Sequence, residues 1–442
     1  MDTKESELIN NIRQQFDNAP YPKVPLEQSP KEDYELLYVH NLATPYYLKN
    51  KKIVQTKGKV ILDAGCGSGY KSLILAEANP GAKIVGVDIS EESIKLARQR
   101  LQYYGFEDTE FHVLSIEELP SLGLEFDYIN TDEVLYLLPD RVNGLLAMKS
   151  VLKPDGIIRT NLHSSTGRNL IYCAQEVFKL MGLMDESPGD LEIELVREIM
   201  TALRDEVMLK KISWNSERGN SQEWILANYL LLGDKVCTVP EMFSALKAAN
   251  LELISMVNWQ QWELLNLFKT PDDLPAFLGM SLPETSLEDR LHLFTLLHPT
   301  HRLLDFWCTH RDDENRTESV VPVSEWTLSD WQAARVHLHP QLASPQARED
   351  LLNSIAAQTP FQISRYIPLP VPSPIAIESV RAACLLPLWD GVQPVRSLVK
   401  RWLQLRPVHP ATLESVTEET AFAEVKELLE RLEAFLYVLL ER

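Results

Sequence analysis

The chain has few cysteines, and none of them forms a paired motif. Its five cysteines are spread over 442 residues and include no CxxC pair. Small secreted domains that rely on disulfides carry many closely spaced cysteines, so this composition excludes a disulfide scaffold. We therefore expect the protein to reside in a reducing compartment.

Long apolar runs are also missing. No stretch of eighteen consecutive apolar residues occurs, so neither a membrane-spanning helix nor a membrane partner is expected. Residues 1–18 are polar and acidic, whereas a signal peptide carries basic residues followed by an apolar run. These two absences predict a cytoplasmic protein.

Positive charge is scarce relative to negative charge. Lys and Arg number 43 against 63 Asp and Glu, which gives a formal net charge of −20. Such a chain is repelled by a polyphosphate backbone, so nucleic acid is not an expected partner. With 45% hydrophobic residues, the chain is long enough to bury at least two hydrophobic cores.

The first fifty residues differ from the rest of the chain. An amphipathic start is followed by Pro20, Pro22 and Pro25, and three prolines in six residues forbid a helix. Residues 1–50 are therefore expected to form an extended, tyrosine-bearing arm that caps the next domain.

Residues 51–312 alternate short β-branched runs with helical segments. This alternation is typical of buried parallel strands joined by helices, and it predicts a doubly wound α/β domain. Residues 164–230 lack strand signals, so we expect a helical insertion between two late strands. A highly charged break at residues 311–316 then precedes residues 320–442, for which a smaller and mainly helical domain is predicted.

The chain closes on a predicted helix with an apolar stripe. Ser415 and Glu418 match a capping box, and apolar residues from Phe422 to Leu439 recur at alternating spacings of three and four. Such a stripe indicates either packing within its own domain or the seam of a homodimer. Its length of roughly two and a half heptads favours packing within the domain.

Three alternating glycines follow the first predicted strand. Residues 60–69 have the sequence VILDAGCGSG, which places Gly65, Gly67 and Gly69 between a β-branched run and a helical one. Glycine adopts positive φ and has no Cβ, so backbone here is expected to approach a ligand closely. A dinucleotide, a nucleoside triphosphate and S-adenosylmethionine are the candidate ligands.

Charge and spacing discriminate among these ligands. Tyr70 stands where a phosphate loop requires glycine before Lys71, which argues against a nucleoside triphosphate. A dinucleotide stays the weaker alternative, because the spacing is GxGxG and Asp63 would face a pyrophosphate. S-adenosylmethionine carries cations instead of phosphates, so carboxylates favour it. Asp88, which ends the next strand, can accept hydrogen bonds from both ribose hydroxyls.

With these residues in place, the chain resembles the class I S-adenosylmethionine-dependent methyltransferases over residues 35–310. Residues 63–69 match the family's DxGxGxG loop. Residues 126–136 are similar to its fourth strand and active-site turn, and residues 152–156 resemble the LKPGG turn before the fifth strand. Residues 15–22 (QFDNAPYP) and the NWQQW stretch are also similar to a cyanobacterial subgroup of these enzymes.

The resemblance implies a Rossmann-like sheet of seven strands with a reversed final hairpin, and S-adenosylmethionine as cofactor. It places Asp63, Gly65 and Gly67 at the methionine part, Asp88 at the ribose and Ile89 on the adenine. Where the family usually has an acidic residue at the adenine, this chain has Ser115 and Ile116. The complete set of predicted cofactor residues is Tyr21, Asp63, Gly65, Cys66, Gly67, Gly69, Asp88, Ile89, Ser115, Ile116 and Asp132.

The acceptor is expected at the carboxyl ends of the fourth and fifth strands, where ligands bind in open α/β sheets. His163 at the fifth strand's exit is a candidate general base, and Glu133 and Tyr136 are further catalytic candidates. The alternatives are a histidine that only hydrogen-bonds the loop and a tyrosine that only lines the pocket. No metal is expected, because neither an HExxH motif nor a cysteine partner accompanies His292, His298, His301 and His310.

Residues and resemblance together predict a methyltransferase that acts on a nitrogen or an oxygen of a small-molecule or protein acceptor. The insertion is expected to cover the acceptor as a lid. Around residues 386–391 the C-terminal domain resembles winged-helix-type regulatory modules. Two alternatives stay open: a protein methyltransferase of the phycobiliprotein asparagine type, and a regulator that binds the cofactor without turnover.

Overall fold

The structure, a computed structural model, describes most of the chain. The described residues are 12–14, 16–17, 20–311, 321–368 and 374–442. The first eleven residues of the predicted arm lie outside them, as do residues 312–320, which hold most of the predicted break between the two domains.

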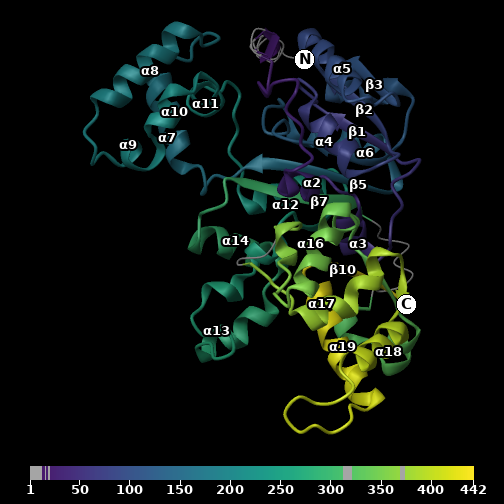
Figure 1. Cartoon of the computed structure of the whole chain (residues 1–442). Coiled ribbons are helices and arrows are strands. Elements are labelled where there is room, and N and C mark those ends of the chain that lie inside the picture. Colours follow the sequence, from purple (N-terminus) through teal and green to yellow (C-terminus); the bar gives the residue numbers. More distant parts are fainter. Residues whose placement is uncertain (1–11, 15, 18–19, 312–320, 369–373) are drawn as a thin grey trace.

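A seven-stranded sheet forms the centre of the larger part of the molecule (Figure 1). Its strand order is β3-β2-β1-β4-β5-β7-β6, and β7 runs antiparallel to both neighbours while the other pairs are parallel. The predicted doubly wound sheet with a reversed final hairpin is therefore confirmed. The strands are β1 (Val60–Ala64), β2 (Lys83–Asp88), β3 (Thr109–Val113), β4 (Phe126–Thr131), β5 (Leu152–His163), β6 (Leu251–Met256) and β7 (Leu303–His310).

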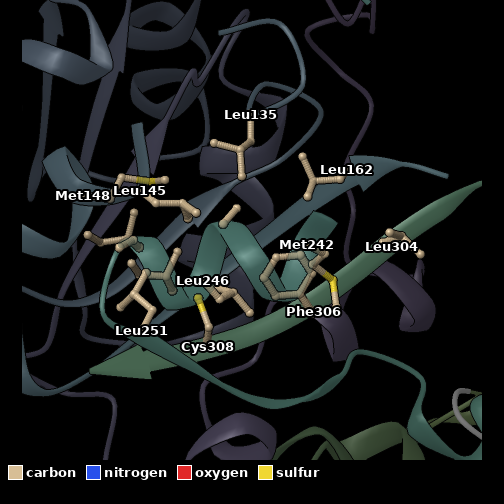
Figure 2. Close-up of a cluster of buried hydrophobic side chains, with 14 of the residues drawn as sticks. Leu135, Leu145, Met148, Leu162, Met242, Leu246, Leu251, Leu304, Phe306 and Cys308 are labelled. Atoms are coloured by element: carbon tan, nitrogen blue, oxygen red, sulfur yellow. The ribbon is translucent and has the colours of Figure 1, made fainter. Parts of the chain in front are cut away.

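Helices cover both faces of the sheet, because successive strand residues point to opposite faces. In β1, Leu62 belongs to one hydrophobic cluster and Ile61 to another. Figure 2 shows the first cluster, in which Phe306 of β7 lies beside Met242 of α12. The cluster that contains Leu62 also includes residues of α6 and α14. The cluster that contains Ile61 includes residues of α2 to α5. These helices are α2 (Tyr34–Val39), α3 (Ala43–Asn50), α4 (Tyr70–Ala78), α5 (Glu91–Tyr103), α6 (Arg141–Ser150), α12 (Val239–Ala248) and α14 (Leu287–Leu297).

The helices α7 to α11 follow β5, where the sequence predicts an insertion. Four of them, α7, α8, α9 and α11, share an apolar cluster around Phe178, Met200 and Tyr229. The group stands apart from the sheet at the upper left of Figure 1. No helix in the described part of the chain is both long enough and apolar enough to span a bilayer. The inserted helices are α7 (Asn169–Leu180), α8 (Asp190–Ala202), α9 (Met208–Ser213), α10 (Ser216–Asn220) and α11 (Gln222–Asn228).

The C-terminal region has a hydrophobic core of its own, which includes Trp331, Trp402 and Leu429. Helices surround a small antiparallel sheet of order β10-β8-β9, so the predicted mainly helical C-terminal region is confirmed. The similarity to winged-helix modules stays a prediction. The elements are α15 (Leu328–Ala333), β8 (Arg335–Leu338), α16 (Pro345–Ala356), α17 (Ser379–Leu385), β9 (Gln393–Pro394), α18 (Val395–Leu405), α19 (Glu418–Glu433) and β10 (Val438–Glu441).

The last helix is shorter than predicted and begins later. Thr417, instead of Ser415, caps α19 by accepting a hydrogen bond from the Thr420 amide. The helix ends before Leu436, which has a φ of 58°, and the chain then forms β10 along β8. The apolar stripe of α19 is buried in the core of its own region, with Leu429 fully covered. The stripe therefore packs within its own region, as the first of the two alternatives has it, and homodimerisation stays a prediction.

Two helices occupy the part of the chain that the sequence assigns to an extended arm. Helices α2 and α3 lie between the large sheet and the C-terminal region. The Tyr47 hydroxyl donates to Glu433 (2.9 Å) and accepts from the amide of Leu440 (3.0 Å). Thr44 contacts the buried His339 ring at 3.1 Å. These buried polar contacts join the N-terminal segment to the last elements of the chain.

Leu429→Ala is expected to lower the free energy of unfolding by about 2 to 5 kcal/mol, because it leaves a cavity in a packed core. The matched control is Leu328→Ala, whose side chain is 61% exposed and whose loss changes stability by about 0.5 kcal/mol or less. Urea unfolding measures both. Sedimentation velocity is expected to show the same oligomeric state in all three proteins. A wild-type dimer that dissociates in Leu429→Ala, with little loss of stability, would instead support a homodimer interface along this stripe.

Candidate active site

The glycine loop joins β1 to α4 through left-handed backbone. Gly65, Gly67 and Gly69 have φ angles of 83°, 51° and 81°. At Gly67 a Cβ atom would lie 2.1 Å from the carbonyl oxygen of Tyr21, so only glycine lets these two segments approach so closely. The loop therefore presents bare backbone to its neighbours.

The segment after Tyr21 is fastened across this loop by hydrogen bonds. The Ser68 amide donates to the Tyr21 carbonyl (3.0 Å), and the Ser68 hydroxyl donates to the Pro22 carbonyl (2.7 Å). Arg100 of α5, only 4% exposed, donates to two further carbonyls of the arm, those of Val24 (2.7 Å) and Pro25 (3.0 Å). The predicted arm thus lies directly on the glycine loop.

Asp63 lies behind the loop and is buried. One carboxylate oxygen accepts from the Ser72 hydroxyl (2.6 Å) and the other from the Asn130 side chain (2.9 Å). Burial raises the pKa of Asp63 to about 6, although these two hydrogen bonds oppose the shift. Its carboxylate therefore ties the loop to α4 and β4, and direct contact with the cofactor stays a prediction.

Asp88 supports the loop from the end of β2. Its carboxylate accepts from the amides of Gly67 (2.9 Å) and Ser90 (2.9 Å), and burial raises its pKa. Each carboxylate oxygen has a second lone pair, which leaves acceptor capacity for a pair of hydroxyls. The chemistry of this side chain therefore suits a ribose.

The residues predicted to contact adenine follow β2 and β3. The ends of these strands lie side by side, because the Leu114 amide donates to the Asp88 carbonyl (2.9 Å). Ile89 is half-buried, and the Ser115 hydroxyl donates to Glu118 (3.0 Å). Ile116 is buried within the hydrophobic cluster that underlies the sheet. The structure brings these residues to one edge of the sheet, and their contact with adenine stays a prediction.

A buried charge network underlies the turn after β4. Asp132 pairs with Lys71 (2.6 Å) and with Arg159 (3.4 Å). Arg159 also bonds to Asp305 of β7 (2.7 Å) and to Asn130 of β4 (2.9 Å). Burial alone would raise the pKa of Asp132, but the charges of Lys71 and Arg159 outweigh it and hold that pKa well below its usual range. Asp132 is therefore a carboxylate anion at neutral pH.

Glu133 follows in a strained conformation and faces away from the core. Its φ is 62°, which for a residue with a long side chain costs about 1 to 3 kcal/mol. The backbone is held by its amide, which donates to Asn161 (2.9 Å). The carboxylate accepts from the Tyr136 hydroxyl (2.8 Å), pairs with Arg302 and lies 3.3 Å from His163 Nε2. Burial alone would raise the pKa of Glu133, but His163 and Arg302 hold it at about 2.

His163 lies beneath this carboxylate, with 1% of its side chain exposed. Its ring stacks on Tyr136, with 3.6 Å between ring centroids, and Nδ1 lies 2.7 Å from a carboxylate oxygen of Asp234. The structure thus brings the three predicted catalytic residues together. It also places His163 behind Glu133, and the ring lines neither cavity.

Sequence analysis missed Asp234 and Arg302. Asp234 lies 71 positions from His163, and Arg302 lies 169 positions from Glu133. Each belongs to a polar segment between helical or strand patterns, which local periodicity does not distinguish from an ordinary loop. In the described part of the chain, no group of three or more acidic, histidine or cysteine side chains is arranged to hold a metal ion.

Two cavities meet at this cluster. The larger, of about 1130 Å³, lies between the arm, the insertion and the β4 turn, and Tyr136 is in its wall. The smaller, of about 610 Å³, borders the glycine loop. Tyr21, Glu133 and Arg302 line both cavities. Five of the predicted cofactor residues line the smaller cavity: Tyr21, Gly65, Cys66, Gly67 and Asp132. The other six line neither cavity: Asp63, Gly69, Asp88, Ile89, Ser115 and Ile116.

Comparison with known proteins identifies the family of the chain. The family profile described as a methyltransferase domain matches residues 55–202. An uncharacterised protein from Synechococcus sp. is 33% identical over 308 residues, which cover 62% of this chain and 72% of that protein. The ubiquinone biosynthesis O-methyltransferase of Haemophilus ducreyi is 32% identical over 114 residues, or 24% of this chain and 48% of the enzyme. The chain belongs to the class I S-adenosylmethionine-dependent methyltransferases.

This methyltransferase also has the fold of a larger solved structure. PKMT2 from Rickettsia typhi, solved in complex with AdoHcy, covers 90% of the chain with a TM-score of 0.58 and 16% sequence identity. The match spans 75% of that protein, whereas the match to the O-methyltransferase spans about half of its length. The likeness to PKMT2 therefore extends over most of the chain and concerns the fold.

S-adenosylmethionine is the cofactor of this family, and the residues of the glycine loop suit it. The glycines give the loop its left-handed backbone and let it pack closely against neighbouring segments, and the Asp88 carboxylate keeps acceptor capacity for two ribose hydroxyls. Asp132 and Glu133 are anions near the loop, which favours a ligand with an ammonium and a sulfonium charge. Neither a phosphate nor a metal is needed to explain this set of side chains.

Gly67→Ala is expected to lift the arm from the loop, because the added methyl group would lie 2.1 Å from the Tyr21 carbonyl. Trypsin cleavage after Lys23 should then accelerate several-fold, as measured by mass spectrometry. Gly105→Ala is the matched control: its φ is 79°, which imposes a similar backbone strain, but nothing lies within 4 Å of the new Cβ. Equal cleavage of the two variants would contradict the docking of the arm on Gly67.

Asp63→Asn is expected to flatten the pH dependence of stability. The folded protein holds the Asp63 proton with a pKa of about 6 against an ordinary value of 3.8, so its contribution is complete below about pH 3.8 and is lost as the pH rises through 6. Above that pH the wild type loses on the order of 3 kcal/mol relative to the variant. Urea unfolding between about pH 4 and 7 measures the change. A constant difference between the two proteins would disprove this role.

Proposed function

We propose that the methyltransferase transfers a methyl group to a nitrogen or an oxygen of an acceptor bound in the larger cavity. The observation that carries this proposal is that Tyr21, Glu133 and Arg302 line both cavities. Ligands in the two cavities would therefore meet at this wall. The insertion contributes residues 187–190, 222–224 and 226–228 to the larger cavity, which supports its role as a lid.

Methyl transfer is an in-line displacement, and different residues of the chain contribute to it. The bound cofactor supplies a methyl group on a sulfonium cation. Asp88 and the loop backbone hold the ribose and the methionine part, and the arm and the insertion keep water out. Asp132 and Glu133 place negative charge where a sulfonium cation is favoured. Positioning and charge therefore supply most of the catalysis that we propose.

Glu133 orients the acceptor. Among the described residues, its Oε1 atom is bonded only by Arg302, which leaves a lone pair for an N–H or O–H of the acceptor. As the new bond to the methyl carbon forms and its bond to sulfur breaks, the acceptor's proton leaves through Glu133 to His163 Nε2, which lies 3.3 Å away. Glu133 is protonated only in passing, because a carboxyl group with a pKa of about 2 readily releases the proton again.

A regulator that binds the cofactor without turnover is the alternative class. The placement of Glu133 between the two cavities, with a buried histidine behind it, favours turnover, because a binding protein has no need for a proton acceptor at this wall. The larger cavity is lined by apolar residues as well as charged ones, which suits either a small molecule or a side chain of a protein substrate.

Calorimetry with S-adenosylmethionine and with AdoHcy tests the cofactor assignment. Both are expected to bind, and Asp88→Ala is expected to weaken each about tenfold or more, because hydrogen bonds to a charged group contribute about 1.5 to 3 kcal/mol. Asp108→Ala, an exposed acid before β3, is the control and should leave both affinities unchanged. Unchanged affinity in Asp88→Ala would refute the ribose assignment.

Methyl transfer is tested with labelled S-adenosylmethionine and cell lysate separated into protein and small-molecule fractions. We expect label in one fraction, and loss of that label with Glu133→Gln, which removes the charge that faces both cavities. Cofactor binding with no label in either fraction would instead support the regulator. Failure of both ligands to bind would overturn the assignment of the loop.

A further inference from the structure

We propose that Asp234 is a positioning residue that fixes the ring of His163, so that the insertion supplies part of the proton-accepting machinery as well as a lid. This inference rests on the proposed function, in which His163 receives the acceptor's proton. Asp234 follows the last inserted helix, α11, and its side chain is only 1% exposed. Nothing else in the mechanism uses this buried acid.

The contact between the two side chains is short and fully enclosed. His163 Nδ1 lies 2.7 Å from Asp234 Oδ1, and 1% of each side chain is exposed. A carboxylate has no hydrogen to donate, so this contact requires the proton of the neutral ring to be on Nδ1. In the neutral ring the lone pair of Nε2 then faces Glu133 and the cavities, whereas a proton on Nε2 makes the hydrogen bond that lowers the pKa of Glu133. The ring is thus held in the form that can accept a proton from that side.

The insertion holds the other oxygen of this carboxylate. Gln175 of α7 donates to Asp234 Oδ2 (2.9 Å), and the buried Arg168 donates to the same oxygen (3.4 Å). Arg168 also donates to Asn228 of α11 (3.1 Å), which links the two inserted helices. Burial alone would raise the pKa of Asp234, but the hydrogen bonds from His163 and Gln175 hold it below its usual range. The carboxylate is therefore ionised, with Gln175 and Arg168 on Oδ2 and the Tyr172 hydroxyl donating to Oδ1 at 3.5 Å.

The remaining neighbours of the ring explain why its orientation needs a fixed partner. Tyr136 stacks on one face, while Glu133 and Arg302 approach Nε2 at 3.3 Å and 3.4 Å. Glu133 would accept a hydrogen from Nε2, whereas Arg302 would donate one to it. These two neighbours favour opposite tautomers, so Asp234 on the far nitrogen decides between them.

Asp234→Asn tests this assignment because it reverses the hydrogen bond. Gln175 and Arg168 both donate, so the new amide is expected to turn its oxygen toward them and its NH₂ group toward His163 Nδ1. The ring must then carry its proton on Nε2, where it cannot accept another. We expect methyl transfer to fall about a hundredfold or more, with affinity for S-adenosylmethionine unchanged.

The tautomer is measured directly in the full chain labelled with ¹⁵N-histidine, by proton–nitrogen correlation spectra of the imidazole rings. His163→Gln identifies the signals of this ring. In the wild type we expect the proton on Nδ1, and in Asp234→Asn on Nε2. Asp205→Asn makes the same chemical change at an exposed acid of the insertion, whose side chain is 91% exposed, and should alter neither tautomer nor transfer.

The outcomes separate the inference from the proposed function. A wild-type ring with its proton on Nε2 overturns the inference without any variant, so a poorly folded Asp234→Asn does not leave it untested. An unchanged tautomer in a folded Asp234→Asn, or a reversed tautomer with undiminished transfer, overturns it as well. A wild type that binds the cofactor and labels no acceptor overturns the proposed function, and the spectra still decide whether Asp234 orients the ring.

Discussion

The candidate site depends on one buried positive charge, the guanidinium of Arg159. It is 3% exposed and bonds to β4 through Asn130 and to β7 through Asp305, while Asp132 shares the same charge. Breaking such a buried pair typically costs about 3 to 5 kcal/mol, because an uncompensated charge is left in the interior. Asn130 also donates to Asp63, so the same network of hydrogen bonds reaches β1. One side chain thus aligns the strand ends at which the cavities form.

The same network explains why Glu133 keeps a strained backbone. Asn161 accepts from the Glu133 amide while its side-chain amide donates to Asp132, so the turn is fixed from within the sheet. The Glu133 side chain is consequently directed away from the core, toward the wall shared by the two cavities. Arg302 and Tyr136 then hold its carboxylate in place. The strain at one residue is offset by contacts that also give the carboxylate its position.

Local sequence pattern predicts the sheet, the glycine loop and the candidate residues at the strand ends, because each follows from a short run of residues. It fails where a distant contact decides the structure. Residues 34–50 were expected to be extended, yet helix α3 forms and buries Tyr47 against Glu433. The last helix stops before Leu439, whose backbone pairs with β8. Asp234 has no motif at all, since its role arises only when the fold places it beside His163.

The arm makes the C-terminal region part of the environment of the cofactor loop. Residues 20–25 lie on that loop, helix α2 forms a wall of the smaller cavity, and helix α3 is bonded to Glu433 and Leu440 near the end of the chain. These three pieces are consecutive, so the arm is tethered at a short distance from the loop it covers. A short tether lowers the conformational entropy that is lost when the arm is ordered on the loop. The C-terminal region therefore anchors the arm, and none of its described residues lines either cavity.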